Sequence, residues 1–328
     1  MANLTTKYLG LELKNPLIVG SSGLTANFDS IERLAKNGAA AVVLKSIFEE
    51  EILQEYKDTF KKELGFQENN LEFFDYYDYQ LKDDMLEKTA QLIGEIKRSL
   101  DIKVIASINC RSTAEWFSYA AKLQDAGADA LELNIFRLPS SIDEDAQTIS
   151  DRYFKIVKKV MNHVTIPVSV KMSPFFTDTA HIAARLSNAG VEGLVLFNRY
   201  YNPDIDLVSN KIVSGQVYSN PTDFTWALRW VAILSGQVKA DLVASSGIHT
   251  PETMIKMLIS GATAVQVVSS LYKNGPDYLM DFLHGLEKWM DEKGIANIAA
   301  LKNYGREMMP ANPEMFERVQ FMKYFGEY

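Results

Sequence analysis

Short apolar runs alternate along the chain with segments of helical spacing. Eight runs rich in Val, Ile and Leu occur at residues 16–20, 40–45, 103–109, 130–135, 167–172, 193–198, 241–246 and 263–268. They are too short for buried helices, and near-continuous apolarity without clean alternation is typical of strands that are covered on both faces. The pattern therefore predicts eight buried, parallel strands.

Helical spacing separates these runs. The clearest segments are residues 28–38, 85–100, 113–127, 152–164, 179–190 and 251–261. Several end at a glycine just past the last apolar position, as a helix C-cap does. Eight strands that alternate with helices predict a (β/α)8 barrel, with a doubly wound open sheet as the alternative.

The pattern predicts one domain over residues 1–328, because no Pro/Gly/Ser-rich linker divides the chain. Three long connections follow strands, at about 46–84, 136–150 and 199–220, and an extension covers about 293–328. In a barrel all three connections lie at the carboxyl ends of the strands, so we expect lids, with tolerated surface insertions as the alternative. The aromatic run LEFFDYYDYQL within the first connection favours a lid that covers a ligand or a second subunit.

Composition excludes several functions. A net charge of −8 and a pI near 5.2 give no electrostatic footprint for nucleic acid or for an anionic membrane. Cys110 is the only cysteine, so the chain can form no internal disulfide and hold no iron-sulfur cluster, and the four histidines show no metal-ligand spacing. Because there is also no signal-peptide core and no membrane-length apolar stretch, we expect a soluble, unprocessed, cytoplasmic protein without a metal.

Polar residues stand where the predicted strands end. In chain order they are Ser21 and Ser22, Lys45 and Ser46, Asn109, Asn134, Lys171, Asn198, Ser245, Ser246 and Gly247, and Ser269 and Ser270. A single lysine at a strand end usually extends into water. Two lysines and three asparagines around one ring instead predict a pocket for a flat heteroaromatic ligand that needs hydrogen bonds along its edges.

The last two strands carry a second signal. The segments ASSGI (244–248) and VVSSL (267–271) place small residues and backbone N–H groups at the usual phosphate position of a barrel, although a plain tight turn is the alternative for either one. A phosphate site beside an amide-rich planar pocket describes a site for flavin mononucleotide (FMN). The fingerprint G-x-G-x-x-G is absent, which argues against NAD bound on a Rossmann turn.

Six segments resemble the FMN-dependent dihydroorotate dehydrogenase family, most closely its soluble class 1 members. They are residues 15–23, 42–46, 131–134, 168–176, 196–198 and 245–276, in order over nearly the whole chain. The resemblance implies FMN as cofactor, a homodimer, and hydride transfer from a ring carbon of a small substrate to flavin N5 while a loop base removes a proton from the neighbouring carbon. It leaves room for a separate electron-transfer subunit.

The resemblance also implies site roles. Ser21 or Ser22, Lys45, Ser46, Asn134, Lys171 and Asn198 would contact the flavin or the substrate, with Asn109 beside them, and Gly215, Ser246, Gly247 and Ser269 would hold the phosphate. Lys171 is similar to the family lysine at the flavin N1/O2 edge, where a fixed cation stabilises the anionic reduced ring. Lys45 is similar to the family lysine near N5 and the substrate.

The chain departs from the family on the substrate side. Class 1 members carry N-x-S-C-P-N with cysteine as base, whereas Arg137 stands at the cysteine position here, and arginine stays protonated. Ser140 or Ser141 would replace the base only if one residue were skipped. The family motif N-x-x-G-L-P-N is also missing, with Asn69 and Asn70 as loose substitutes.

Arginine also replaces a small residue after the sixth strand, at Arg199. Arg137, with or without Arg199, either binds an anionic group of the substrate together with Lys45, Asn134 and Asn198, or pairs with acids such as Asp75, Asp78 or Asp143.

Two functions follow from these observations. The first is an FMN-dependent oxidoreductase that acts on a CH–CH or C=C bond of a small, anionic or pyrimidine-like substrate. The second is a flavin-binding barrel that has lost its chemistry and serves a binding or regulatory role.

Overall fold

The computed structural model describes residues 2–48, 71–109, 115–135, 138–200, 202–308 and 316, without the side chains of 48, 71–84 and 115. Eight parallel strands form a closed ring in which each strand is hydrogen-bonded to both neighbours. Around the ring they are β3 (Leu17–Val19), β4 (Ala41–Val43), β6 (Lys103–Asn109), β7 (Ala130–Asn134), β8 (Val168–Lys171), β9 (Gly193–Leu196), β12 (Asp241–Ser245) and β13 (Ala264–Val267). Because β13 pairs with β3 and closes the ring, the predicted (β/α)8 barrel is confirmed and the open sheet is excluded.

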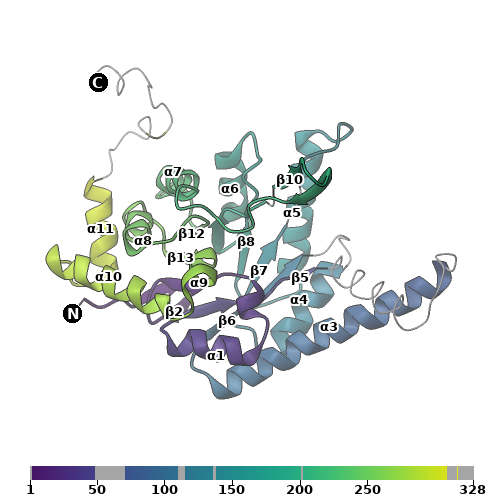
Figure 1. Ribbon diagram of the computed structural model, residues 1–328, viewed down its shortest axis with the longest axis horizontal. Helices are drawn as coiled ribbons and strands as arrows, with labels where there is room; N and C mark the ends of the chain where they lie inside the picture. Colours follow the sequence, from purple (N-terminus) through teal and green to yellow (C-terminus); the bar gives the residue numbers. More distant parts are fainter. Residues whose placement is uncertain are drawn as a thin grey trace.

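Helices cover the outside of the ring (Figure 1). They are α1 (Phe28–Lys36), α3 (Leu71–Ser99), α4 (Glu115–Asp125), α5 (Ala146–Met161), α6 (Thr179–Asn188), α7 (Phe224–Leu234) and α8 (Pro251–Ile259). Beyond β13 the chain adds the short α9 (Ser269–Asn274), then α10 (Tyr278–Glu292) and α11 (Ile298–Met308). Helix α11 packs closely on α8, since a Cβ atom at Gly305 would lie 2.1 Å from the Ile259 carbonyl oxygen.

Local sequence explains where helices begin. Asn27 caps α1 by accepting a hydrogen bond from the Ser30 N–H over 3.0 Å. Thr250 caps α8 in the same way, and Pro251 occupies the first helical position, where its missing N–H costs nothing. Gly261 then ends this helix region with a φ of +113°, a conformation that favours glycine.

A two-stranded hairpin closes the amino-terminal end of the barrel. It consists of β1 (Thr6–Tyr8) and β2 (Leu11–Leu13). Tyr8 and Leu9 are buried against interior residues of the ring, and the Leu9 N–H donates to Asp241 Oδ2 over 2.9 Å. Because this end is filled, a ligand has access to the interior only from the carboxyl ends of the strands.

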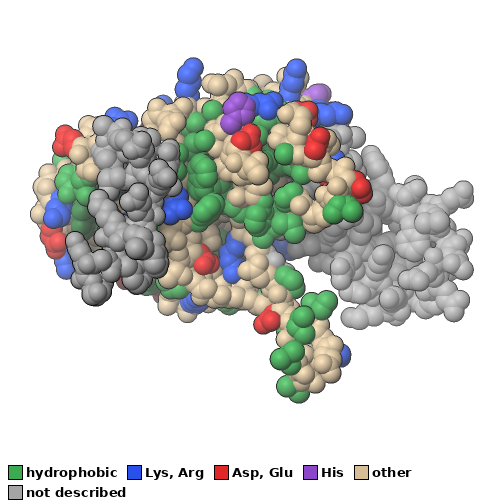
Figure 2. Space-filling view, turned by 90° about the horizontal axis from the view of Figure 1, so that it is seen from above, with side chains coloured by type: hydrophobic (Ala, Val, Ile, Leu, Met, Phe, Trp, Pro, Cys, Tyr) green, Lys and Arg blue, Asp and Glu red, His purple; other side chains and the backbone are tan. Residues whose placement is uncertain are grey.

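The long connections contain more regular structure than the pattern predicts. Helix α3 begins at Leu71, well before the predicted residue 85, and extends past the barrel in Figure 1. The first connection also holds β5 (Ile47–Phe48), which extends the ring by pairing with β6. The third contains a hairpin of β10 (Pro203–Asp206) and β11 (Lys211–Ser214), which projects from the body as an arm with apolar side chains in Figure 2.

The described helices include none that is both long and apolar enough to cross a membrane.

Candidate functional site

Strand alternation brings polar side chains into the barrel. Glu132 and Asn134 lie two positions apart on β7, and Ser169 and Lys171 lie two apart on β8, so each pair points to the same side of the sheet. The register aligns Glu132 with Ser169 and Asn134 with Lys171. All four are buried, and below them the interior is filled by an apolar layer with the Tyr8 hairpin. The barrel therefore has an apolar floor and a polar upper layer.

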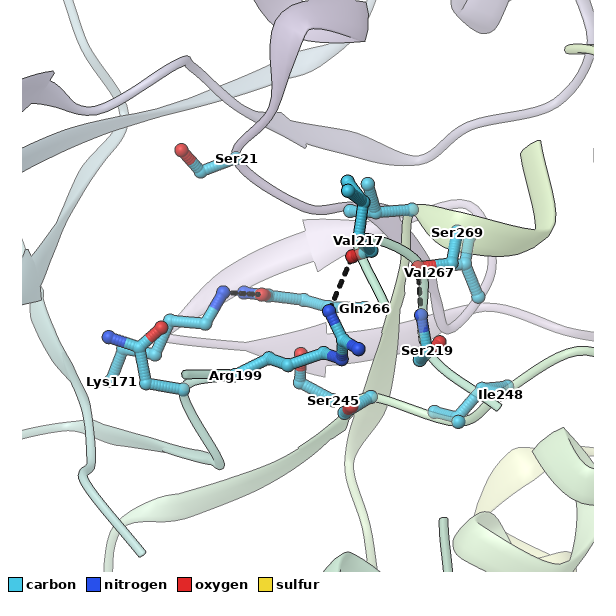
Figure 3. Close-up of a pocket in the computed structure, with 14 residues that line it drawn as sticks. Ser21, Lys171, Arg199, Val217, Ser219, Ser245, Ile248, Gln266, Val267 and Ser269 are labelled. Carbon is cyan, nitrogen blue, oxygen red and sulfur yellow. Dashed lines mark hydrogen bonds between the residues drawn. The ribbon is translucent and has the colours of Figure 1, made fainter. Parts of the chain in front are cut away.

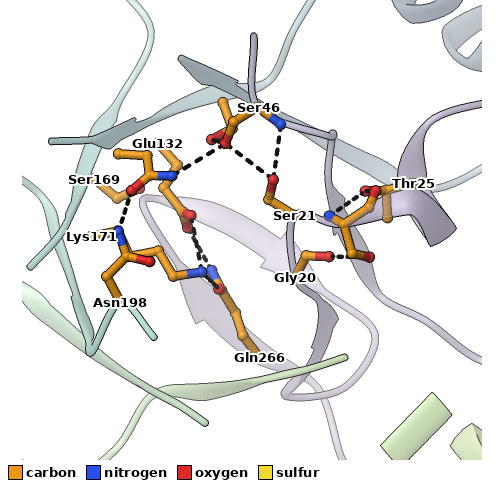
Figure 4. Close-up of polar contacts among 12 residues, drawn as sticks. Gly20, Ser21, Thr25, Ser46, Glu132, Ser169, Lys171, Asn198 and Gln266 are labelled. Atoms are coloured by element: carbon orange, nitrogen blue, oxygen red, sulfur yellow. Dashed lines mark hydrogen bonds and ion pairs between the residues drawn. The ribbon is translucent and has the colours of Figure 1, made fainter. Parts of the chain in front are cut away.

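Ser46 connects the side chains at the mouth of the barrel (Figure 4). Its hydroxyl lies 2.7 Å from that of Ser107 and 3.1 Å from that of Ser21, and it accepts from Asn134 Nδ2 over 3.4 Å. Asn198 Nδ2 in turn donates to Asn134 Oδ1 over 2.5 Å. The structure thus brings four of the predicted site residues into one hydrogen-bonded network.

Lys171 belongs to a second network, one layer deeper. Its ammonium donates to Gln266 Oε1 over 3.2 Å and lies 3.7 Å from Glu132 Oε1. Gln266 Nε2 donates to Glu132 Oε2 over 2.5 Å. Side chains from three strands therefore hold the lysine in place inside the ring, as Figure 4 shows.

A cavity of about 250 Å³ opens beside these networks (Figure 3). Its lining comes from five strand ends and the loop after β11: Ser21, Lys171, Asn198, Arg199, Val217, Ser219, Ser245, Ser246, Gly247, Ile248, Gln266, Val267, Val268 and Ser269. Lys171 and Gln266 stand at one end and the turn after β12 at the other. The cavity thus offers a cation and amides at one end and bare backbone at the other.

The turn after β12 is shaped by glycine. Ser246 and Gly247 both have a positive φ, +77° and +72°, and a Cβ atom at Gly247 would lie 2.1 Å from the Phe224 nitrogen. Successive N–H groups in such a turn form a concave site for anions. Ser269 borders the same cavity and accepts from the Ser219 N–H over 3.0 Å, which ties the β11–α7 loop to the start of α9.

Arg199 supports the cavity wall. Its guanidinium donates to three consecutive carbonyl oxygens, those of residues 216–218, and lies 3.9 Å from Asp223 Oδ2. Neither alternative from the sequence describes this arrangement, because the partners are a loop backbone and Asp223 instead of a substrate or the predicted lid acids. Arg199 therefore shapes the cavity by holding its loop.

A buried histidine lies behind the turn. His249 Nε2 is 2.9 Å from the Ser219 hydroxyl, and Lys273 Nζ donates to the Ser219 carbonyl oxygen over 3.3 Å. Burial, and then the positive charge of Lys273, lower the pKa of His249 below its ordinary value. The neutral imidazole is thus the form that the folded protein favours.

Other predicted residues lie apart from this cavity. Lys45 is exposed and lines a neighbouring cavity of about 490 Å³ between α1 and α3. Ser22 caps the 3₁₀ turn η1 (Gly23–Thr25), and buried Asn109 ends β6 opposite Phe48. Gly215 lies at the base of the β10–β11 hairpin, where its N–H donates to the Asn202 carbonyl oxygen. The roles assigned to these residues stay predictions.

The residues that replace the family base are only partly described. Arg137, Cys110, Asn69 and Asn70 lie outside the described residues. Ser140 and Ser141 are exposed in the loop after β7, and the Ser141 hydroxyl accepts from the Asp143 N–H over 3.2 Å. The identity of the base therefore stays open between the alternatives given by the sequence.

Four residues of the site have no predicted role: Glu132, Gln266, Ser107 and Ser219. Glu132 had a detectable signal, because in the run ALELN a buried-strand glutamate falls on the same face as Asn134. Ser107 likewise lies two positions before Asn109 on β6, on the same face of the strand. The described residues also contain no cluster of His, Cys, Asp or Glu with metal-ligand geometry.

The chain is a closed barrel whose strand ends enclose a lysine, amides and a glycine turn around one cavity. A family model for dihydroorotate dehydrogenase matches residues 3–290, so the chain belongs to the dihydroorotate dehydrogenase family. This family is flavin-dependent, and its members are oxidoreductases that act on the CH–CH group of dihydroorotate. The chain is accordingly a dihydroorotate dehydrogenase-like oxidoreductase.

Curated relatives agree with this family. The catalytic subunit of dihydroorotate dehydrogenase B (NAD(+)) from Thermoplasma acidophilum is 28% identical over 315 residues, which cover 91% of this chain and 97% of that protein. The subunit of the same name from Methanocaldococcus jannaschii is 27% identical over 305 residues, 89% of this chain and 95% of that protein. That from Desulforamulus reducens is 31% identical over 214 residues, 62% of this chain and 68% of that protein.

Proposed function

We propose that the cavity between Lys171 and the Ser246–Gly247 turn binds FMN, and that the chain uses it to oxidise or reduce a CH–CH bond of a small, anionic, pyrimidine-like substrate. The observation that carries this proposal is the pairing, in one cavity, of a buried cation with amides and an anion-binding turn. Bound FMN supplies the acceptor or donor for the hydride.

The residues present fit this cofactor. The turn at Ser246 and Gly247 has the two positive φ angles that favour an anion-binding backbone, and together with Ser269 it lines the cavity where a phosphate would lie. Lys171 offers a fixed positive charge at the other end, where an electron-rich ring edge is stabilised. Asn134 and Asn198 hold each other in place at the mouth, so their remaining amide donors and acceptors can orient a planar ligand.

We propose that Arg137 binds the anionic group of the substrate, since a guanidinium recognises a carboxylate through two parallel hydrogen bonds. The substitution Arg137→Cys tests whether this site is a family site that lacks only its cysteine base. If the site is a family site without its base, dihydroorotate oxidation should appear or rise in R137C. Unchanged activity would show that the pocket serves a different molecule.

We further propose partners. The relatives are named catalytic subunits, which favours a separate electron-transfer subunit for this chain. A homodimer is supported by the β10–β11 hairpin, where Ile205, Leu207, Val208 and Ile212 are 65%, 83%, 93% and 79% exposed. The cytoplasm is the proposed location, since the chain has a single cysteine and needs no oxidising compartment.

The test begins with the purified protein. Flavin absorbance, with FMN released on denaturation, is the expected result, and colourless protein that takes up no added FMN would reject the proposal. The bound flavin is then reduced by light and mixed with orotate, fumarate or uracil in turn. Reoxidation by orotate supports the proposed oxidoreductase. Reoxidation by none of the three compounds supports the alternative, a flavin-binding barrel without dehydrogenase activity. No observation on the described residues favours that alternative.

A further inference from the structure

A fully buried carboxylate lies inside the barrel next to the lysine of the proposed flavin site. Glu132 is 0% exposed, and its two oxygens face two different partners, Gln266 Nε2 at 2.5 Å and Lys171 Nζ at 3.7 Å. Oε1 has no hydrogen-bond partner among the described residues. An isolated buried carboxylate is strongly disfavoured, so the charge of Lys171 is what makes this position tenable.

The groups that face Glu132 from below add no second cation. Ser169 contributes a buried hydroxyl, which donates to the Leu131 carbonyl oxygen. Tyr8 contributes a phenol whose pKa is raised well above its ordinary value, first by burial and then by the negative charges of Glu132 and Asp241. The phenol therefore stays neutral, and Lys171 is the cation that balances Glu132 within the described part of the interior.

Gln266 joins the two charges and fixes their arrangement. It is 2% exposed, and its amide places the NH₂ group toward the carboxylate and the oxygen toward the ammonium. The reverse orientation would set two acceptors and two donors against each other. The amide thus holds the ammonium at the cavity wall and keeps Glu132 directed at it.

We propose that Glu132 is a positioning residue that acts through Lys171, setting both the place of the ammonium and the net positive charge that it presents to the flavin ring. The inference rests on the proposed function. A cation with a buried counter-charge 3.7 Å away attracts a developing anion less strongly than the same cation alone. Glu132 therefore limits how much the site favours reduced, anionic FMN over oxidised FMN.

The decisive substitution is Glu132→Gln, which keeps the shape and can still accept the hydrogen bond from Gln266. The measured quantity is the ratio of the dissociation constants of oxidised and reduced FMN at pH 8, together with the two-electron reduction potential of the bound flavin. E132Q should raise the ratio about tenfold in favour of reduced FMN, equivalent to a rise of about 30 mV in the potential. Neither readout requires turnover.

Two further variants show whether the effect passes through Lys171. Lys171→Met should change the ratio in the opposite direction. Adding E132Q to K171M should then produce less than a twofold further change, because the residue through which Glu132 acts is gone. A tenfold effect of E132Q that persists in the K171M background would overturn the inference.

Asp241→Asn is the matched control, because it removes another carboxylate near Tyr8, one that lies at the opposite end of the barrel. D241N should leave the ratio within twofold of wild type even if it lowers the melting temperature. If E132Q does not fold, Glu132→Asp draws the carboxylate back by one methylene and should shift the ratio two- to threefold in the same direction as expected for E132Q.

The outcomes separate this inference from the proposed function. Wild type that binds no FMN overturns both. If wild type binds FMN but E132Q leaves the ratio unchanged, only the role of Glu132 is overturned. E132D replaces E132Q in this comparison if E132Q does not fold.

Discussion

The Asn198 side chain donates a hydrogen bond of 2.5 Å to the side-chain oxygen of Asn134, although 64 residues separate the two in the chain. Asn134 ends β7 and Asn198 follows β9, so the contact spans the end of β8, where Lys171 stands. Asn134 also reaches Ser46 on the other side. One asparagine therefore ties three strand ends together around the mouth of the proposed flavin site.

Asn134→Ala should weaken both the fold and the site. It removes two side-chain hydrogen bonds, one with the half-buried amide of Asn198 and one with Ser46, which together cost about 1–3 kcal/mol of unfolding free energy. FMN affinity should fall at least tenfold, because the mouth loses its fixed amides. Urea denaturation and fluorescence titration with FMN measure the two effects.

Asn303→Ala is the control for this substitution, since Asn303 is exposed on α11 and far from the barrel mouth. It should change unfolding free energy by less than about 0.5 kcal/mol. Equal FMN affinity in N134A and N303A would contradict the assignment of Asn134 to the site.

Gly247→Ala tests the anion-binding turn. The new Cβ would meet the Phe224 nitrogen at 2.1 Å and would also force alanine into a φ of +72°. We expect a loss of more than about 3 kcal/mol in stability, from a steric clash added to the about 1–2 kcal/mol cost of the left-handed conformation. FMN binding should be lost even at temperatures where the variant remains folded by circular dichroism.

Gly236→Ala separates the two causes. Gly236 has a similar φ of +81°, but nothing lies within 4 Å of the position of its Cβ. This variant should lose only about 1–2 kcal/mol and keep FMN. Similar losses in G236A and G247A would show that backbone conformation, and not the close approach of Phe224, determines the requirement for glycine.

The eight strands could be predicted from sequence because a strand covered on both faces must be apolar over its whole length. Helix α7 is not among the predicted helices, since FTWALRWVAIL is apolar nearly throughout and has only Thr225 and Arg229 to mark a polar face. The β10–β11 hairpin was also missed. Its two strands are exposed on both sides, so no burial pattern marks them.

The site was predictable in its strand-end residues but not in its deeper partners. Glu132 and Gln266 meet across the barrel from positions 134 residues apart, and no local pattern encodes such a contact. Lys45, in contrast, is a predicted site residue that does not line the proposed flavin cavity. It lies two residues beyond the end of β4, where strand alternation no longer fixes direction, and its side chain lines the neighbouring cavity.

His249 should make stability depend on pH. Its folded-state pKa lies below the unfolded value of about 6.5, so the unfolded chain binds more protons as the pH falls through that value. The contribution of His249 to the free energy of unfolding is therefore fully present above about pH 6.5, and it declines as the pH falls below that value. His249→Gln should flatten this decline, at a cost of about 1 kcal/mol at pH 7.5 from the weakened contact with Ser219.

Ser219→Ala serves as the comparison, because it removes the hydroxyl partner but leaves the imidazole buried. Denaturant unfolding at pH 5.5 and 7.5 should show that S219A keeps the decline while H249Q loses most of it. A decline of wild-type size in H249Q would assign the pH dependence to other groups.

The hairpin should mediate self-association. Ile205 and Ile212 face each other in the β10–β11 register and are 65% and 79% exposed, which is unfavourable in water unless a partner covers them. The double variant Ile205→Asp, Ile212→Asp should shift a homodimer to monomer in analytical ultracentrifugation, since two carboxylates cannot enter an apolar interface without partners. Ile142→Asp is the matched control: Ile142 is 100% exposed in the loop after β7, so I142D should leave the dimer intact. Dissociation in both variants would point to general charge repulsion, and a dimer that persists in both would place the interface elsewhere.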